Sequence, residues 1–194
     1  MIKIGFSGIH GSGKTALIYE LKKVLGIKYN IEILDDISNK SPFDDDKETN
    51  FISQFYYFTT QINEENKKAL NSPEILLCDK SLFDQLIYWK KYLSKVGENK
   101  QMSEKDDVLR AIFDYWIKTY DLIFFLRVDQ EVMETRKSSN QLRDEFVKPN
   151  GNSESLYLKA IKKEGIEVLE IWNNKSIDET LYKIAEKISE KLEE

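Results

Sequence analysis

A glycine-rich segment near the amino terminus has a spacing that suits phosphate binding. It runs Gly8-Ile-His-Gly-Ser-Gly-Lys-Thr15 and satisfies the pattern G-x-x-x-x-G-K-[ST] in full. Glycines let backbone N–H groups converge on an anion without clashes from Cβ atoms, and the amino terminus of a following helix adds its dipole. The segment therefore predicts a phosphate-binding loop for a nucleoside triphosphate, with ATP and Mg²⁺ as the expected cofactors.

Each side chain of this loop has an expected role. Lys14 would reach the β- and γ-phosphates, and the Thr15 hydroxyl would bind Mg²⁺. His10 is the single histidine of the sequence and occupies a variable position of the motif, so we expect it to line the loop rather than to act as a base. The predicted nucleotide-binding residues before Lys14 are Gly8, His10, Gly11, Ser12 and Gly13.

A second acid follows the apolar run Ile75–Cys78. An acid at the end of such a strand holds Mg²⁺ or its water in proteins with a phosphate-binding loop. Asp79 is therefore predicted to share the metal with Thr15. The next residues, Ser81-x-x-Asp84, have the form of a capping box, so Asp84 is expected to cap the following helix.

Alternating strand and helix patterns place these residues in an α/β fold. A parallel sheet covered on both faces is expected, with ligands at the carboxyl ends of its strands. The predicted strands are Ile2–Phe6, Ile31–Leu34, Ile75–Cys78, Leu122–Leu126 and Ile166–Leu169. The predicted helices are Lys14–Leu25, Thr49–Leu70, Ser81–Val96, one that begins at Ser103 and one that begins at Ser176.

Composition narrows the class of protein. The sequence has 194 residues, which suits one domain, and a net charge of −5, which disfavours general nucleic-acid binding. Its one cysteine, Cys78, lies in an apolar run, which predicts a buried residue in a protein of a reducing compartment. No apolar run approaches the roughly 20 residues of a membrane span. We expect a cytoplasmic protein that does not bind membranes.

Two segments resemble known kinases. Asp79-Lys-Ser-Leu-Phe-Asp84 resembles the Asp/Glu-Arg-Ser segment of deoxynucleoside kinases, and is similar to segments of thymidylate kinases and of nicotinamide-riboside kinase-like proteins. Gln54 to Gln61 resembles the aromatic, glutamine-bearing helix that holds the nucleobase in deoxynucleoside kinases. The resemblance implies a three-layer domain over residues 1–194 with five parallel strands in the order 2-3-1-4-5. It also implies that Gln54 and Gln61 bind substrate.

The sequence departs from these kinases at Lys80, where they have arginine. A lysine supplies one positive charge near the acceptor but lacks the planar fork of a guanidinium. Lys80 is nevertheless predicted to take part in catalysis beside Asp79.

The acids after the second strand would face the acceptor. The resemblance implies a carboxylate here that takes a proton from the acceptor hydroxyl. Asp35 and Asp36 point to opposite sides of an extended chain, so only one is expected to serve, and Asp35 is slightly preferred. A solvated acidic loop is the alternative. Residues 31–49 contain no arginine, whereas thymidylate kinases have one here that clamps a monophosphate, so an uncharged nucleoside fits better.

Arginines after the fourth strand resemble the lid of nucleoside and nucleotide kinases. Arg136 and Arg143 would close over the triphosphate from a lid segment at about residues 136–150, with surface ion pairs as the alternative. Trp172-Asn-Asn174 lies where such proteins hold the adenine.

The predicted activity is Mg²⁺-dependent transfer of the ATP γ-phosphoryl group to a small acceptor, most simply a nucleoside hydroxyl. A nucleoside monophosphate kinase, a P-loop NTPase that is not a kinase and a polynucleotide 5′-kinase are alternatives. A GTPase is disfavoured because Asp79-Lys-Ser-Leu82 lacks the glycine that its switch requires. The aromatic face between Phe51 and Phe58 would permit a homodimer.

Overall fold

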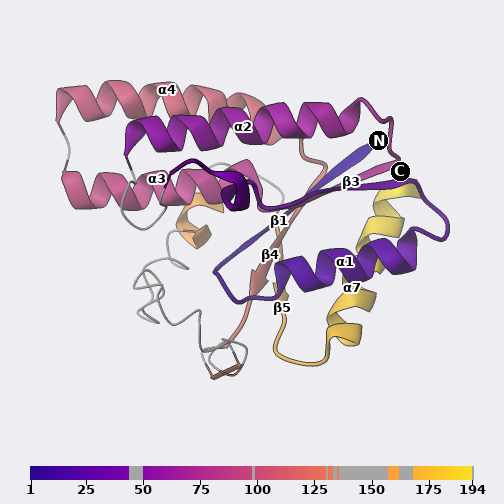
Figure 1. Ribbon diagram of the computed structural model, residues 1–194. Helices are drawn as coiled ribbons and strands as arrows, with labels where there is room; N and C mark the ends of the chain where they lie inside the picture. The colour runs from indigo at the N-terminus through magenta and orange to yellow at the C-terminus, as the bar shows by residue number, and fades with distance from the viewer. Residues whose placement is uncertain are drawn as a thin grey trace.

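A parallel sheet forms the centre of the protein (Figure 1). The computed structural model describes residues 1–43, 50–97, 99–129, 131–132, 135, 157–161 and 168–193. Its five strands lie in the order β2-β3-β1-β4-β5 and pair in parallel throughout, as predicted. They are β1 (Ile2–Gly8), β2 (Ile31–Leu34), β3 (Ile75–Asp79), β4 (Leu122–Arg127) and β5 (Val168–Trp172).

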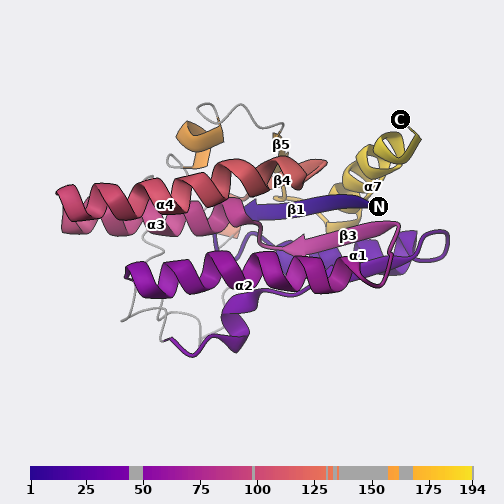
Figure 2. The same cartoon turned by 90° about the horizontal axis from the view of Figure 1, so that it is seen from above.

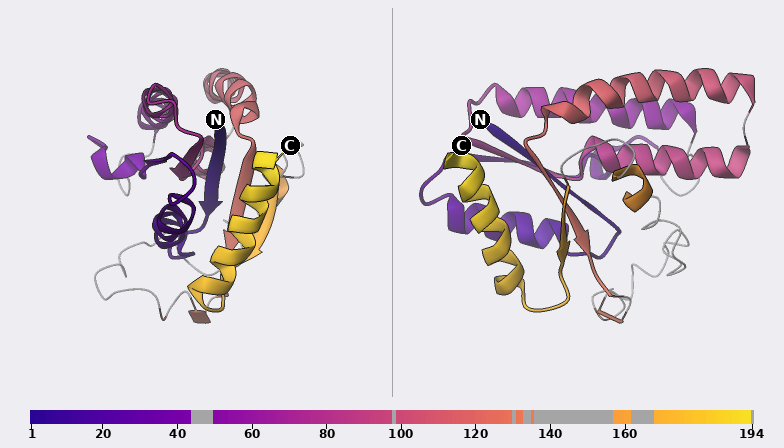
Figure 3. Two further views of the ribbon diagram at one scale, coloured as in Figure 1. Left: turned by 90° about the vertical axis from the view of Figure 1, so that its right-hand side faces the viewer. Right: turned by 180° about the vertical axis from the view of Figure 1, so that it is seen from behind.

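Helices cover both faces of this sheet. One layer is formed by α1 (Lys14–Leu25) and α7 (Ile177–Glu193), which contact each other (Figure 3). The other layer is formed by α2 (Phe51–Ala69), α3 (Leu82–Val96) and α4 (Lys100–Trp116), and α2 and α4 run side by side in it (Figure 2). Two short 3₁₀ helices, η1 (Ile37–Lys40) and η2 (Ile117–Thr119), connect to these elements.

The strands divide their side chains between the two layers because successive residues point to opposite faces. Phe124 and Leu126 of β4 pack in the core under α1 and α7, whereas Ile123 and Phe125 pack in the core under α3 and α4. On β1, Ile4 and Phe6 belong to the first core. The alternate residues of β1 therefore face the second layer.

Two predicted boundaries were wrong. β5 ends at Trp172 rather than at Leu169, because its pairing with β4 runs on to Arg127. The predicted start at Ile166 lies outside the described residues. α4 begins at Lys100 after an Asn99 cap, which accepts a hydrogen bond from the Met102 amide at 3.0 Å.

The Ser103-x-x-Asp106 pattern therefore lies inside α4 and is not its start. Asp106 instead accepts hydrogen bonds from the Trp89 indole and Arg110, both at 2.8 Å. The other helices begin within two residues of their predicted starts.

None of the helices in the described residues is long and apolar enough to cross a membrane. Cys78 is fully buried, as predicted, and packs with Leu34, Leu76 and Tyr57 where α2 covers β2 and β3.

The core under α3 and α4 depends on large buried side chains of α4. We predict that Phe113→Ala lowers the free energy of unfolding by about 3–5 kcal/mol, because the truncation leaves a cavity against Phe83. Tyr115→Ala on the exposed side of the same helix should change it by about 0.5 kcal/mol or less. Urea unfolding of both variants measures the difference. Equal losses would show that Phe113 does not anchor this core.

Candidate active site

The glycine-rich loop adopts backbone conformations that demand glycine. Gly8 has φ +141°, and a Cβ there would come within 2.4 Å of the Leu126 carbonyl oxygen. Gly13 precedes α1 in the left-handed conformation, with φ 91°. α1 has no side-chain cap and no acid in its first turn, whereas α2, α3 and α4 all begin at capping side chains. The first amides of α1 are thus available to an anion.

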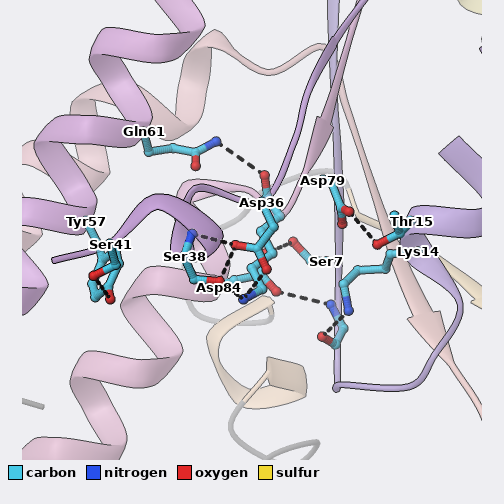
Figure 4. A network of polar contacts seen from close by, with 12 residues as sticks. Ser7, Lys14, Thr15, Asp36, Ser38, Ser41, Tyr57, Gln61, Asp79 and Asp84 are labelled. Atoms are coloured by element: carbon cyan, nitrogen blue, oxygen red, sulfur yellow. Dashed lines mark hydrogen bonds and ion pairs between the residues drawn. The ribbon is translucent and has the colours of Figure 1, made fainter. Parts of the chain in front are cut away.

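Lys14 lies inside this loop. Its ammonium donates to the carbonyl oxygens of Gly8 at 2.9 Å and Ile9 at 3.0 Å (Figure 4). Burial lowers the pKa of Lys14, and the nearby Asp84 carboxylate acts in the opposite direction. Its third acceptor is the Ser12 hydroxyl at 3.3 Å. An ammonium whose hydrogen-bond acceptors are all neutral oxygens would gain from exchanging them for phosphate oxygens.

Thr15 and Asp79 meet at the start of α1. The Thr15 hydroxyl donates to Asp79 Oδ2 at 2.5 Å. Burial raises the pKa of Asp79, and the Thr15 hydrogen bond and the Lys14 charge only partly oppose this shift. A buried carboxylate beside a hydroxyl supplies the hard oxygen ligands that Mg²⁺ prefers, with the remaining ligands coming from phosphate and water. The residues present therefore fit Mg²⁺.

An ion pair joins the loop after β2 to the end of β3. Lys80 Nζ lies 2.7 Å from Asp36 Oδ2, and both side chains are largely buried. Asp36 also accepts hydrogen bonds from the Ser38 amide and hydroxyl, at 3.0 and 2.7 Å. Burial would raise the pKa of Asp36, but Lys80 and Ser38 bring it below its usual value. Asp36 thus remains an ionised acceptor beside a fixed cation.

Lys80 is held as a cation by the same neighbours. Burial opposes its charge, but Tyr88 and Asp36 outweigh this effect and raise the pKa of Lys80 above its ordinary value.

Asp35 lies in a different environment from Asp36. It is exposed, and it accepts a hydrogen bond from the Tyr19 hydroxyl of α1 at 2.5 Å. The adjacent acids point apart, as the sequence predicted, and it is Asp36 that faces Lys80.

The two predicted substrate-binding glutamines are buried on α2. Gln54 and Gln61 are 4% and 0% exposed, and the amide oxygen of each is buried without a hydrogen-bond partner. Buried polar atoms nearly always have a hydrogen-bond partner in folded proteins, so two buried amide oxygens without one on the same helix face are unusual. Phe58 of the same helix is core, whereas Phe55 is 39% exposed.

Asp84 caps α3, as predicted, and does more. Its Oδ2 accepts the Ser81 amide at 2.8 Å and the Ser7 hydroxyl at 2.7 Å. Its Oδ1 accepts the Gly8 amide at 3.2 Å and the Tyr157 hydroxyl at 2.8 Å. Asp84 therefore ties the start of the phosphate-binding loop to α3 and to segment 157–161. Figure 4 shows Asp84 beside Ser7.

The sequence analysis missed Ser7 and Tyr157. Ser7 had a detectable signal, because it and Lys3 are the two polar side chains of a strand that is otherwise apolar. Tyr157 had none, because it contacts Asp84 from a distance of 73 residues along the chain.

The segment after β5 supports the loop from its other side. The Asn173 amide donates to the Ser12 carbonyl at 2.8 Å, and its oxygen accepts the Thr180 hydroxyl at 3.1 Å. Next to it, the Arg127 guanidinium stacks on the exposed Trp172 ring, 4.2 Å from the ring centre. Arg127, which sequence reasoning did not single out, forms with Trp172 a flat surface beside the loop.

The roles of three further residues stay predictions. His10 is exposed at the tip of the loop. Arg136 and Arg143 of the predicted lid lie outside the described residues.

Comparison with known proteins identifies the family. The model of a family described as an AAA domain matches residues 3–179, which is most of the chain. The protein belongs to this AAA domain family. No curated protein sequence matches it.

Solved kinases share the fold of this AAA domain protein. Deoxyadenosine kinase from M. mycoides with bound dCTP is 18% identical with a TM-score of 0.69, and covers 97% of this chain and 100% of its own. The structure of the same enzyme with bound dATP is 17% identical with a TM-score of 0.70, and it also covers 97% of this chain and 100% of its own. Thymidylate kinase from Candida albicans is 16% identical with a TM-score of 0.69, covering 100% of this chain and 93% of its own. The fold is thus that of nucleoside and nucleotide kinases.

The Asp84 network makes a prediction about stability. Asp84→Asn places an NH₂ group against the donors of Ser7 and Ser81 or of Gly8 and Tyr157, which should lower the free energy of unfolding by about 2–4 kcal/mol. Asp107→Asn on the exposed face of α4 is the matched control, with an expected change of about 0.5 kcal/mol or less. Chemical denaturation followed by circular dichroism compares the two. A loss at Asp84 no larger than at Asp107 would contradict the network.

Proposed function

We propose that the protein transfers the γ-phosphoryl group of ATP to a hydroxyl group of a nucleoside, in an Mg²⁺-dependent reaction. The observation that carries this proposal is the Asp36–Lys80 pair, which lies at the carboxyl edge of the sheet close to Lys14 and the Thr15–Asp79 pair (Figure 4). One edge thus combines a phosphate-binding loop, a metal-binding oxygen pair and an ionised carboxylate. A protein that only bound nucleotide would not need the carboxylate, because its role is to orient an attacking oxygen.

The loop residues would hold the triphosphate. The backbone from Gly8 to Thr15 surrounds the phosphates and Lys14 contacts the β- and γ-phosphates, while Thr15 and Asp79 hold Mg²⁺. When bound, the metal neutralises charge on the phosphates and aligns them for transfer. Arg127 and Trp172 offer a stacking surface for the base of the triphosphate, next to the Asn173 support.

On the acceptor side, we assign the positioning carboxylate to Asp36 in place of Asp35. Asp36 would accept a hydrogen bond from the acceptor hydroxyl and take its proton as the oxygen attacks the γ-phosphorus. Lys80 would keep Asp36 ionised and supply positive charge near the transferred group. Asp35 is occupied by Tyr19 and faces solvent.

A nucleoside is favoured over a monophosphate. Residues 31–49 contain no arginine, and two acids, Asp35 and Asp36, follow β2 directly, so an incoming phosphate monoester would meet negative charge. The orphaned oxygens of Gln54 and Gln61 would accept hydrogen bonds from a polar ring such as a nucleobase. The neighbouring deoxyadenosine kinase fold is consistent with this class of substrate.

The remaining features of the proposal rest on sequence. One kinase domain would span residues 1–194, with a lid at about 136–150 from which Arg136 and Arg143 neutralise the transferred group. We propose a cytoplasmic enzyme, with a homodimer as a further possibility.

Phosphate transfer from labelled ATP with Mg²⁺ tests the function directly. The acceptor panel consists of nucleosides, nucleoside monophosphates and a 5′-hydroxyl oligonucleotide. We expect transfer to a nucleoside, and a loss of at least about 100-fold in Lys14→Met and Asp79→Asn at unchanged melting temperature, because each removes charge stabilisation of the transferred group.

Each other outcome has a clear meaning. Transfer only to monophosphates would establish the thymidylate-type alternative. ATP hydrolysis without transfer to any acceptor would refute the kinase proposal, as would full turnover in folded Lys14→Met.

The adjacent acids provide a matched pair of variants. Asp36→Asn should reduce kcat for nucleoside phosphorylation by about 100-fold or more, because the amide cannot take the proton of the acceptor. Asp35→Asn should leave kcat nearly unchanged, because its carboxylate points to Tyr19. Steady-state kinetics at saturating ATP separate the two. A larger loss of kcat in Asp35→Asn than in Asp36→Asn would show that Asp35 is the positioning carboxylate.

A further inference from the structure

Lys80 has an unusual backbone conformation. Its φ is 77°, in the left-handed region that residues with a Cβ rarely adopt, and Ser72 is the one other non-glycine residue with positive φ in the described part of the chain. Such conformations persist where surrounding contacts fix them, and they cluster at functional sites. The contacts that fix Lys80 are therefore of interest.

Contacts from two elements hold the Lys80 backbone. Its N–H donates to the Phe6 carbonyl of β1 at 3.1 Å, and its carbonyl accepts a hydrogen bond from the Gln61 Nε2 of α2 at 3.3 Å. With the peptide groups on both sides fixed, the side chain reaches Asp36 at 2.7 Å. The position of the proposed catalytic cation thus depends on Gln61.

Gln61 has one possible orientation. Its Nε2 donates to the Lys80 carbonyl and, at 2.9 Å, to Glu65 Oε1, and both partners can only accept. The reverse orientation would place the amide oxygen against these two acceptors. Figure 4 shows the Gln61 side chain extending from its helix toward the region where Asp36 and Asp79 lie.

Glu65 is a fully buried carboxylate with donors on both oxygens. Oε1 accepts from Gln61 and Tyr120, and Oε2 accepts from Lys3 Nζ and the Trp116 indole, both at 2.7 Å. Lys3 is 5% exposed and Glu65 is 2% exposed. The ammonium also lies over the rings of Trp116 and Tyr120, 4.7 and 4.5 Å from their centres.

A buried ion pair of this kind is seldom needed for stability, because apolar residues of the same volume serve as well. This pair, however, places a carboxylate acceptor beside the Lys3 ammonium, at the point where the Gln61 amide must be oriented.

We infer that Glu65 is a positioning residue for the acceptor side of the site, acting through Gln61 to hold Lys80 in the conformation that reaches Asp36. Glu65 does not touch substrate. The inference rests on the proposed function for its kinetic consequence, but its structural part, the control of the Lys80 conformation, does not.

The test uses Glu65→Gln in a Lys3→Met background, so that no unpaired charge is left buried, with Lys3→Met as its reference. A glutamine at position 65 can turn its NH₂ toward Gln61, which would release the Lys80 carbonyl. We expect kcat/KM for the nucleoside to fall by about tenfold or more, with KM for ATP unchanged. In a Gln61→Met background the same change at position 65 should have little further effect, because both act on one path.

Trp116→Phe is the matched control. It removes another donor to Glu65 but leaves Gln61 untouched, so it should lower the melting temperature without changing nucleoside kinetics. If the variants at positions 65 and 116 lose stability alike and both keep wild-type kcat/KM for the nucleoside, Glu65 is structural only and the inference is overturned.

A crystal structure of the Gln61→Met variant makes the inference testable without activity. Lys80 should leave the left-handed region or lose its contact with Asp36. An unchanged Lys80 would overturn the inference even in an active enzyme. If the wild-type protein phosphorylates no acceptor, the proposed function fails. The crystal structures of the Gln61→Met variant and of the Lys3→Met/Glu65→Gln variant then decide the roles of Gln61 and Glu65.

Discussion

The central strand β1 must supply side chains to two layers at once, and the site depends on how it does so. Ile4 and Phe6 fill the core under α1 and α7. The alternate positions are Lys3, Gly5 and Ser7, and only the small Gly5 allows Ser81 to approach, since an added Cβ would lie 2.9 Å from the Ser81 Cβ. The strand that leads into the phosphate-binding loop thus presents polar groups to the layer of α2, α3 and α4.

Each of these polar groups engages one buried carboxylate. Lys3 pairs with Glu65, and Glu65 accepts a hydrogen bond from Gln61. Gln61 in turn donates to the Lys80 carbonyl. Ser7 donates to Asp84, which also binds the Gly8 amide. The first carboxylate is compensated by an ammonium and the second by hydroxyl and amide donors, which are two ways to meet the cost of burying a charge. Both sets of contacts end at the carboxyl edge of the sheet, where phosphate and acceptor would meet.

Local sequence patterns predicted the parts of the molecule that local forces determine. The glycine-rich loop, the strand order implied by the kinase resemblance and the Asp84 cap follow from short motifs. The start of α4 was misplaced because Ser103-x-x-Asp106 imitates a capping box, while the real cap, Asn99, forms no such pattern. Sequence slightly favoured Asp35, whereas our proposal assigns the role to Asp36, because the contact that distinguishes the two acids is with Lys80, which is 44 positions away from Asp36. Glu65 carried no signal, because a single acid on a helix is usually exposed.

The position of Trp172 has a practical consequence. The protein has three tryptophans. Trp89 is fully buried and the Trp116 indole is bound to Glu65, whereas Trp172 is 48% exposed, with its ring against Arg127 and its neighbour Asn173 bound to the Ser12 carbonyl. Of the three indoles, that of Trp172 is therefore the one most exposed to solvent, since Trp89 is buried and Trp116 is partly buried. The intrinsic fluorescence of the native protein therefore contains a built-in optical reporter for events over the phosphate-binding loop, without any label.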